Sequence, residues 1–154
     1  MPAEETRAAV VFAGAPLQVT PRLSQRLEAL ANLYVVAADS GAATALAFGL
    51  KPDVVIGDLD SISDATRAQL QGVEFRTYPR AKDATDSELA IQHALQARPK
   101  ELLLLGFLNG PRLDMTLANL LLLLALAPGA VMVDERNEAS LLRGGGSRTW
   151  QPEP

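Results

Sequence analysis

The residues best suited to chemistry in this sequence are carboxylates in short, closely spaced groups. Asp58 and Asp60 are separated by one residue, and Ser61 follows them, directly after the apolar run 54–56 and Gly57. Two carboxylates in one loop are able to share a divalent ion such as Mg²⁺, because hard cations prefer oxygen ligands. The same residue types are common in solvated acidic turns. The spacing alone leaves a metal site and a simple turn as open alternatives.

A second charged group occupies the segment 82–88. Thr85 and Glu88 fit a capping box that opens a helix. That box does not account for Lys82, Asp83 and Asp86, whose charges lie at the expected helix N-terminus, where anions bind readily. We expect the cap to fix the loop and the loop to present these charges to phosphate and metal.

Asn109, Arg112 and Asp114 form a third group, in the segment 106–114. The arginine guanidinium has a planar fork of donors that suits phosphate oxygens. A structural alternative stays open, in which Asp114 caps the next helix and Arg112 pairs with it. Asn119 lies farther along that apolar helix, where an amide is costly to bury unpaired. We therefore expect Asn119 to bond back to this loop.

Short apolar strands and helical segments alternate along the chain and must position these groups. We expect strands over 8–13, 33–38, 54–56, 74–78, 102–105, 131–133 and 139–142. We expect helices from Pro21, over 42–48, over 63–70, over 86–97 and over 114–126. This alternation is typical of βαβ units. It predicts a three-layer, doubly wound α/β fold, with a mostly parallel sheet and helices on both faces.

The carboxyl ends of the expected strands are where the polar groups gather. Ligands of open parallel sheets bind in the crevice at these ends. Asp39 follows the second strand, and the three groups described above follow the third, fourth and fifth strands. We therefore expect them to converge on one rim, with the carboxylates and the few cations that a Mg²⁺-nucleotide site requires.

Composition narrows the class of protein. The chain has 154 residues, a net charge of −4 and no cysteine. The length predicts one domain over 1–143, followed by a polar tail, or the start of a further domain, over 144–154. The acidic charge argues against non-specific nucleic-acid binding, which needs a basic face. The lack of cysteine excludes disulfides and a thiolate nucleophile. The single histidine, His93, lies within a helix, and we expect it to pack.

Membrane insertion is not expected from the apolar segments. The first five residues lack the basic start and apolar core of a signal peptide. The apolar stretches 120–127 and 131–133 are separated by Pro128-Gly129. Neither reaches the ~20 residues that cross a bilayer. We expect a soluble, cytoplasmic protein without a membrane partner.

Four stretches, in this order, resemble the catalytic domain of the thiamine pyrophosphokinase family. They are Ala38-Asp39-Ser40-Gly41-Ala42, Lys51-Pro52-Asp53-Val54-Val55-Ile56-Gly57-Asp58-Leu59-Asp60-Ser61-Ile62, Lys82-Asp83-Ala84-Thr85-Asp86-Ser87-Glu88-Leu89-Ala90, and Gly110-Pro111-Arg112-Leu113-Asp114 through Leu117-Ala118-Asn119. The resemblance spans about residues 8 to 142, which is most of the chain.

The resemblance implies a Mg²⁺-dependent transfer in which thiamine and ATP become thiamine diphosphate and AMP. It implies that Asp58, Asp60 and Asp83 are the metal-binding and catalytic carboxylates, with Asp86 in the same pocket. We give Asp60, Asp83 and Asp86 catalytic roles, and our hypothesis is that Asp83 or Asp86 orients the hydroxyl or accepts its proton. The residues expected to contact substrate or nucleotide are Asp39, Ser61, Lys82, Thr85, Asn109, Arg112 and Asp114. It also implies a homodimer.

The sequence departs from the family pattern at several points. Pro111 replaces a second glycine, Met115 replaces a residue that is often polar, and Ser40 replaces a glycine after Asp39. The all-β domain that usually follows in the family does not appear before Pro154. Three alternatives remain: a diphosphokinase for another alcohol such as a pterin, a non-catalytic nucleotide- or metal-binding module, and a haloacid-dehalogenase-type phosphatase, which also uses an Asp-x-Asp motif after a strand.

Overall fold

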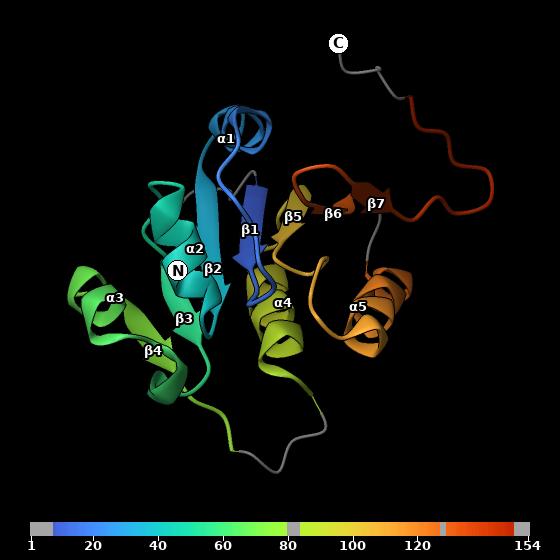
Figure 1. Ribbon diagram of the computed structural model, residues 1–154. Helices are drawn as coiled ribbons and strands as arrows, with labels where there is room; N and C mark the ends of the chain where they lie inside the picture. The colour runs from blue at the N-terminus through green and yellow to red at the C-terminus, as the bar shows by residue number, and fades with distance from the viewer. Residues whose placement is uncertain (1–7, 80–83, 127–128, 150–154) are drawn as a thin grey trace.

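A computed structural model describes residues 8–79, 84–126 and 129–149 (Figure 1). The strands in these ranges are β1 (Ala8–Phe12), β2 (Leu33–Ala38), β3 (Val54–Ile56), β4 (Glu74–Arg76), β5 (Glu101–Leu105), β6 (Ala130–Val133) and β7 (Glu138–Ser140). The α-helices are α1 (Pro21–Glu28), α2 (Gly41–Ala47), α3 (Asp64–Gln69), α4 (Asp86–Gln96) and α5 (Leu113–Ala125).

The described strands form one sheet in the order β4-β3-β2-β1-β5-β6-β7. All neighbouring pairs are parallel except β6 and β7, which are antiparallel. From β1 the chain builds the sheet outward to β4, and it then returns through α4 to add β5 on the other side of β1. The direction of winding therefore reverses between β1 and β5, which is the point where such folds bind ligands.

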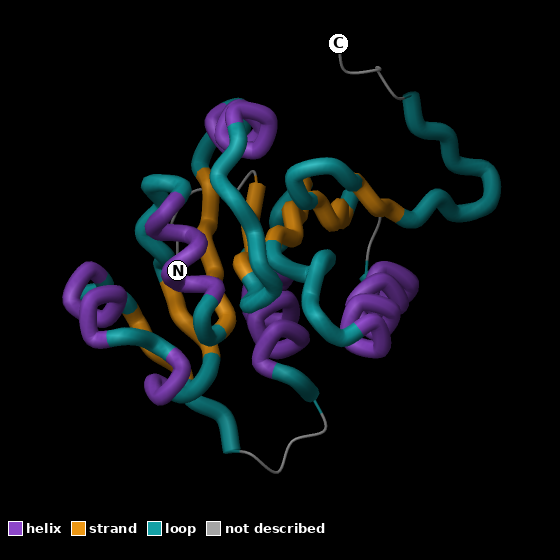
Figure 2. The backbone as a smooth tube through the Cα atoms, in the orientation of Figure 1, coloured by secondary structure: helices purple, strands orange, loops and turns teal. Residues whose placement is uncertain are grey.

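A hydrophobic core lies on each face of the sheet, and Figure 2 shows helices around the strands. Residues of α4 and α5 share one core with Ala9 and Val11 of β1. Residues of α1 and α2 share the other core with Val10 and Phe12. Successive side chains of a strand point to opposite faces, so a strand buried on both sides is apolar throughout. The predicted three-layer, doubly wound α/β fold is confirmed.

Local sequence signals explain where α1 and α4 begin. Thr20 caps α1 by accepting a bond from the backbone N–H of Leu23, and Pro21 occupies the first turn, where its missing N–H costs nothing. Thr85 and Glu88 form the predicted capping box of α4, with both reciprocal bonds present. The cap therefore fixes the start of α4 at the rim of the sheet.

The start of α5 differs from the prediction. Arg112 occupies the N-cap position without a side-chain cap bond, and Asp114 lies inside the first turn. Asp114 binds the Arg112 guanidinium through two hydrogen bonds instead, so the interpretation of Asp114 as a cap is wrong and that of an ion pair is confirmed. Asn119 donates to the carbonyl oxygen of Phe107 at 2.8 Å, which confirms its predicted bond to the preceding loop.

The helix α5 is rich in leucine, but few of its side chains are buried. Leu123 is its one buried residue among those described, and Leu117 and Leu121 are 52% and 62% exposed. Figure 1 shows α5 beside β6, at the edge of the layer that contains α4. None of the helices within the described ranges is long and apolar enough to span a bilayer.

His93 in α4 is buried, as expected for a packing residue. Its Nε2 lies 2.9 Å from the Tyr34 hydroxyl, and its Nδ1 has no hydrogen-bond partner in the described part of the chain. Burial, and then the positive charge of Arg76, lower the pKa of His93 from its ordinary value of 6.5. The folded protein therefore binds fewer protons at this site than the unfolded chain just below pH 6.5.

The free energy of unfolding should consequently fall as the pH drops below about 6.5. The part of this fall that comes from His93 should be absent in His93→Gln. The test is urea unfolding of both proteins at pH 5, 6 and 7. The free energy of unfolding of the wild type, minus that of the variant, should decrease from pH 7 to pH 5. A difference that is constant with pH would show that His93 does not titrate on unfolding.

Candidate functional site

Three of the predicted carboxylates meet at the carboxyl ends of the strands. Asp39 follows β2, Asp58 follows β3, and Asp86 is the first residue of α4. All three line a cavity of about 700 Å³, together with Tyr78, Pro79, Ala84, Thr85, Ser87, Leu89 and Met115. The rim predicted from the strand pattern is therefore present, and it brings together residues that are up to 47 positions apart (86 − 39).

Unusual backbone conformations create the close approach of these carboxylates. Asp39 has a φ of 48°, in the left-handed region, where few residues other than glycine, asparagine and aspartate are found. Gly57 has a φ of 126°, and a Cβ placed there would lie 2.1 Å from Oδ1 of Asp39 and 3.3 Å from Oδ2 of Asp86. The carboxyl groups thus occupy the space that a side chain at position 57 would fill.

The carboxyl groups of Asp39, Asp58 and Asp86 lie close together, and burial together with this crowding raises the pKa of Asp39. Burial raises the pKa of Asp39 most, followed by its hydrogen bond and charge interaction with Asp86 and the charge of Asp58, to about 7. A weak bond from Ser61, whose hydroxyl lies 3.4 Å from Oδ1 of Asp39, lowers this pKa. Below about pH 7 the Asp39 carboxyl therefore carries a proton, which it is able to donate to Asp86. A cation that replaced this proton would relieve the repulsion.

The donor set suits a hard divalent ion such as the Mg²⁺ that the sequence resemblance leads us to expect. Asp39, Asp58 and Asp86 supply oxygen atoms to an open cavity, and Mg²⁺ is commonly held by one or two carboxylates plus substrate phosphates. The described residues nevertheless contain no group of three or more carboxylate or histidine side chains already arranged around a single point. Asp83 and Lys82 lie outside the described residues. Asp60 is exposed in the 3₁₀ turn Leu59–Ser61 and does not line the cavity.

A second cavity, of about 250 Å³, lies at the reversal of winding between β1 and β5. It shares Thr85, Ser87 and Met115 with the first cavity, so the two adjoin each other. Its other lining residues are Ala13, Gly14, Ala15, Gly106, Phe107, Gly110, Pro111, Arg112, Thr116 and Asn119. Half of these residues are alanine or glycine, so the cavity extends the acidic cavity between short side chains.

The close backbone approach beside this second cavity depends on glycine. Gly106 has a φ of 77°, and a Cβ there would lie 2.3 Å from the backbone oxygen of Ala13. Its carbonyl accepts a bond from Ala15 at 2.9 Å. The segment after β1 and the segment after β5 are thereby held against each other.

The third predicted group is only partly at this cavity. Arg112 lines it, although its guanidinium is bound to Asp114 at an exposed position. Asn109 lines neither cavity and donates its amide to Asp134 at 2.8 Å. The sequence interpretation missed Asp134 altogether, as well as Gly14, Tyr78 and the lining role of Met115. Asp134 could have been found from a polar turn that follows a buried strand, Asp134-Glu135-Arg136-Asn137.

Comparison with known proteins gives a consistent family. The sequence model of the family "Thiamin pyrophosphokinase, catalytic domain" matches residues 27–133 of this chain. The thiamine pyrophosphokinase of Bacillus subtilis (strain 168) is 30% identical over 115 residues, which cover 73% of this chain and 52% of that protein. The chain therefore spans about half the length of this curated relative.

Solved structures agree with that match. A crystal structure of thiamine pyrophosphokinase from Bacillus subtilis has a TM-score of 0.71 at 26% identity, with 86% of this chain and 62% of that chain covered. A crystal structure of thiamin pyrophosphokinase from Geobacillus thermodenitrificans has a TM-score of 0.67 at 27% identity, with 82% and 59% covered. The chain belongs to the thiamin pyrophosphokinase catalytic-domain family.

Proposed function

We propose that this chain forms the nucleotide- and metal-binding part of a Mg²⁺-dependent enzyme that converts thiamine and ATP into thiamine diphosphate and AMP. The observation that carries the proposal is the meeting of Asp39, Asp58 and Asp86 at one cavity, in a chain of this family. The 700 Å³ volume is ample for a phosphate chain with its metal. We further expect, from the family resemblance, a cytoplasmic homodimer.

The reaction requires the transfer of the β- and γ-phosphoryl groups as one unit. The hydroxyethyl oxygen of thiamine forms a bond to the β-phosphorus, and the bond between that phosphorus and the α–β bridging oxygen breaks. AMP leaves with the bridging oxygen, and the hydroxyl proton passes to a carboxylate. Asp86, which lines the cavity, is our candidate for this base among the described residues.

The other described residues position the substrates and stabilise charge. Bound Mg²⁺ would neutralise charge on the phosphate oxygens, a large part of phosphoryl-transfer catalysis. Asp58, which lines the cavity, would hold it, and the family resemblance adds Asp60 and Asp83 as further ligands. The small residues of the 250 Å³ cavity, with Arg112 at its edge, would receive the AMP portion and its phosphate. Thr85, which lines both cavities, would contact the substrate between them. Asp39 would contact it in the larger cavity, with Ser61 beside Asp39, and Lys82 and Asp114 would make further phosphate and substrate contacts.

The direct test is incubation of the 154-residue chain with Mg²⁺-ATP and thiamine, followed by chromatographic separation of nucleotides and thiamine esters. Equal amounts of AMP and thiamine diphosphate are expected. AMP formation only with a pterin alcohol would reassign the acceptor. ATP binding without AMP would indicate a non-catalytic module, and hydrolysis of a simple phosphoester without nucleotide would indicate a phosphatase.

Asp58→Asn and Asp60→Asn are each expected to lower Mg²⁺-dependent turnover by roughly 10²-fold or more, because each removes a charge that holds the metal at the transferring phosphate. The melting temperature should change little, since both side chains are exposed. The measurement is the initial rate of AMP release over a Mg²⁺ titration, with thermal unfolding of each variant as the control. Undiminished turnover in either variant would remove that residue from the metal site.

A further inference from the structure

Asp134 is a buried carboxylate outside both cavities, at the end of β6. It is 1% exposed and accepts hydrogen bonds from four groups. The backbone N–H groups of Arg136 and Asn137 donate to it at 2.7 and 2.6 Å, and the Asn137 amide at 3.0 and 3.1 Å. The amide of Asn109 donates to it at 2.8 Å. A buried carboxylate that accepts this many hydrogen bonds is held rigidly in one position.

The turn that contains Asp134, residues 134–137, contacts two other segments. Asn109 belongs to the loop between β5 and α5, residues 106–112. Glu135 accepts a bond from the backbone N–H of Gln18 at 2.6 Å, and its second oxygen lies 3.4 Å from the Asn109 amide. Gln18 belongs to the segment between β1 and α1, residues 13–20. One turn therefore binds both segments that meet at the 250 Å³ cavity.

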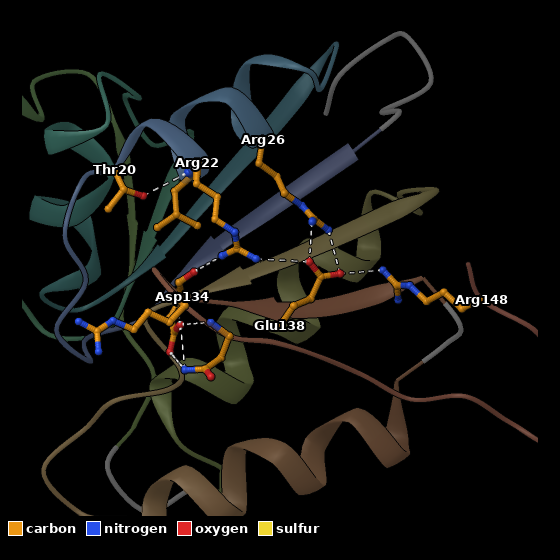
Figure 3. A network of polar contacts seen from close by, with 9 residues as sticks. Thr20, Arg22, Arg26, Asp134, Glu138 and Arg148 are labelled. Atoms are coloured by element: carbon orange, nitrogen blue, oxygen red, sulfur yellow. Dashed lines mark hydrogen bonds and ion pairs between the residues drawn. The ribbon is translucent and has the colours of Figure 1, made fainter. Parts of the chain in front are cut away.

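The turn is itself held from the side of α1 (Figure 3). Arg22 donates to the backbone oxygen of Asp134 at 2.7 Å. Next to the turn, the carboxylate of Glu138 lies 2.6 Å from Arg26, 3.0 Å from Arg148 and 4.0 Å from Arg22. Its side chain is only 11% exposed, so these ion pairs are less screened than pairs at the open surface. The turn is thus anchored to a helix that does not border the cavity.

We propose that Asp134 is a positioning residue, which acts through Asn109 and Glu135 to hold the two walls of the 250 Å³ cavity at the separation that a nucleotide requires. The wall after β5 supplies Gly110 and Arg112, and the wall after β1 supplies Gly14 and Ala15. The identity of the ligand as ATP rests on the proposed function. The positioning of the walls rests on the hydrogen bonds alone.

Asn109 offers the cleanest variant, because it is exposed at the surface and has a φ of 58°, which glycine adopts without strain. Asn109→Gly removes the bond to Asp134 and keeps the backbone conformation. Asn109→Asp places a second carboxylate against Asp134. Asn137→Ala is the matched control, since the Asn137 amide binds the same carboxylate and has no hydrogen bond to the described 106–112 loop.

Two measurements on the full chain test the proposal. One is backbone amide exchange over residues 13–20 and 106–112, and the other is the KM and kcat for ATP in the AMP-release assay. For Asn109→Gly we expect faster exchange in 106–112 and a KM for ATP raised about fivefold, the factor that one net hydrogen bond is worth, with a smaller change in kcat. Asn109→Asp should change both the exchange rate and the KM by more than Asn109→Gly does. Asn137→Ala should change neither.

Unchanged exchange and unchanged KM in Asn109→Gly would overturn the proposal. Equal effects of Asn137→Ala and Asn109→Gly would also overturn it, because they would show general loosening of the turn. A wild-type protein that released no AMP would refute the proposed function instead. In that case the exchange rates of the three variants would still decide whether Asp134 positions the loop.

Discussion

Asp39→Asn is expected to lower turnover by roughly 10²-fold and, in the same protein, to raise the melting temperature at pH 8 in the absence of metal. The loss of turnover follows from the place of Asp39 among the carboxylates of the 700 Å³ cavity. Asparagine is well suited to the left-handed backbone at this position, which has a φ of 48°. The variant should therefore fold normally.

The gain in stability follows from the direction of the pKa shift. The pKa of Asp39 is raised from 3.8 to about 7 by burial and by Asp86 and Asp58. The folded protein thus binds more protons than the unfolded chain between these values, and the stability that Asp39 contributes is lost as the pH rises through about 7. Asparagine removes the charge and keeps a donor for Asp86.

The expected gain in stability of Asp39→Asn is modest, because Asp39 is only partly buried and solvent screens the repulsion between the carboxylates. A difference on the order of 1 kcal/mol corresponds to a rise of about 2–4 °C for a chain of this length. The measurement is thermal unfolding of both proteins at pH 5 and pH 8 with EDTA. The gain should be present at pH 8 and small at pH 5, where the wild-type carboxyl is protonated.

Asp64→Asn provides the control for net charge, since Asp64 lies in the first turn of α3 and lines neither cavity. It should leave turnover unchanged and should not raise the melting temperature. A melting temperature of Asp39→Asn at or below that of the wild type at pH 8 would contradict the account of crowded carboxyls. A fully active Asp39→Asn would place Asp39 outside the reaction.

Gly57→Ala should have the largest combined effect on stability and binding. The new Cβ would lie 2.1 Å from Oδ1 of Asp39, and the φ of 126° is strained for any residue with a side chain. The Asp39 carboxylate, which is part of the site, is the end of a side chain and would be displaced by this contact. We expect the strained backbone to lower the free energy of unfolding by roughly 1–3 kcal/mol, and the displaced Asp39 carboxylate to abolish measurable Mg²⁺-ATP binding.

Gly72→Ala is the matched control, because Gly72 also has a positive φ, of 80°, yet a Cβ there meets nothing within 4 Å. It should lose only about 1 kcal/mol, from backbone strain, and retain binding. Thermal unfolding and calorimetric titration with Mg²⁺-ATP compare the two. The double variant Gly57→Ala/Asp39→Gly should recover part of the lost stability but no activity. Equal losses in the two alanine variants would exclude the clash with Asp39.

Much of this fold is determined by patterns within short segments of the sequence. The apolar runs predicted β1 to β3 to within one residue, because strands buried on both faces must be apolar throughout. Thr20, Thr85 and Glu88 marked helix starts through bonds that reach only three residues. The chain order of Asp39, Asp58 and Asp86 after successive strands was enough to predict one shared rim, because parallel strands end on the same edge.

Tertiary structure alone decided how these residues interact across that edge. Asp39 and Asp86 share a hydrogen bond because Gly57 leaves space between β2, β3 and α4, and that space depends on three elements at once. Asn109 binds Asp134, 25 residues away, and this pairing exists only because β5 and β6 are neighbours in the sheet. Local sequence determines hydrogen bonds within a turn or helix end, whereas contacts between distant loops follow from strand order, which no short segment encodes.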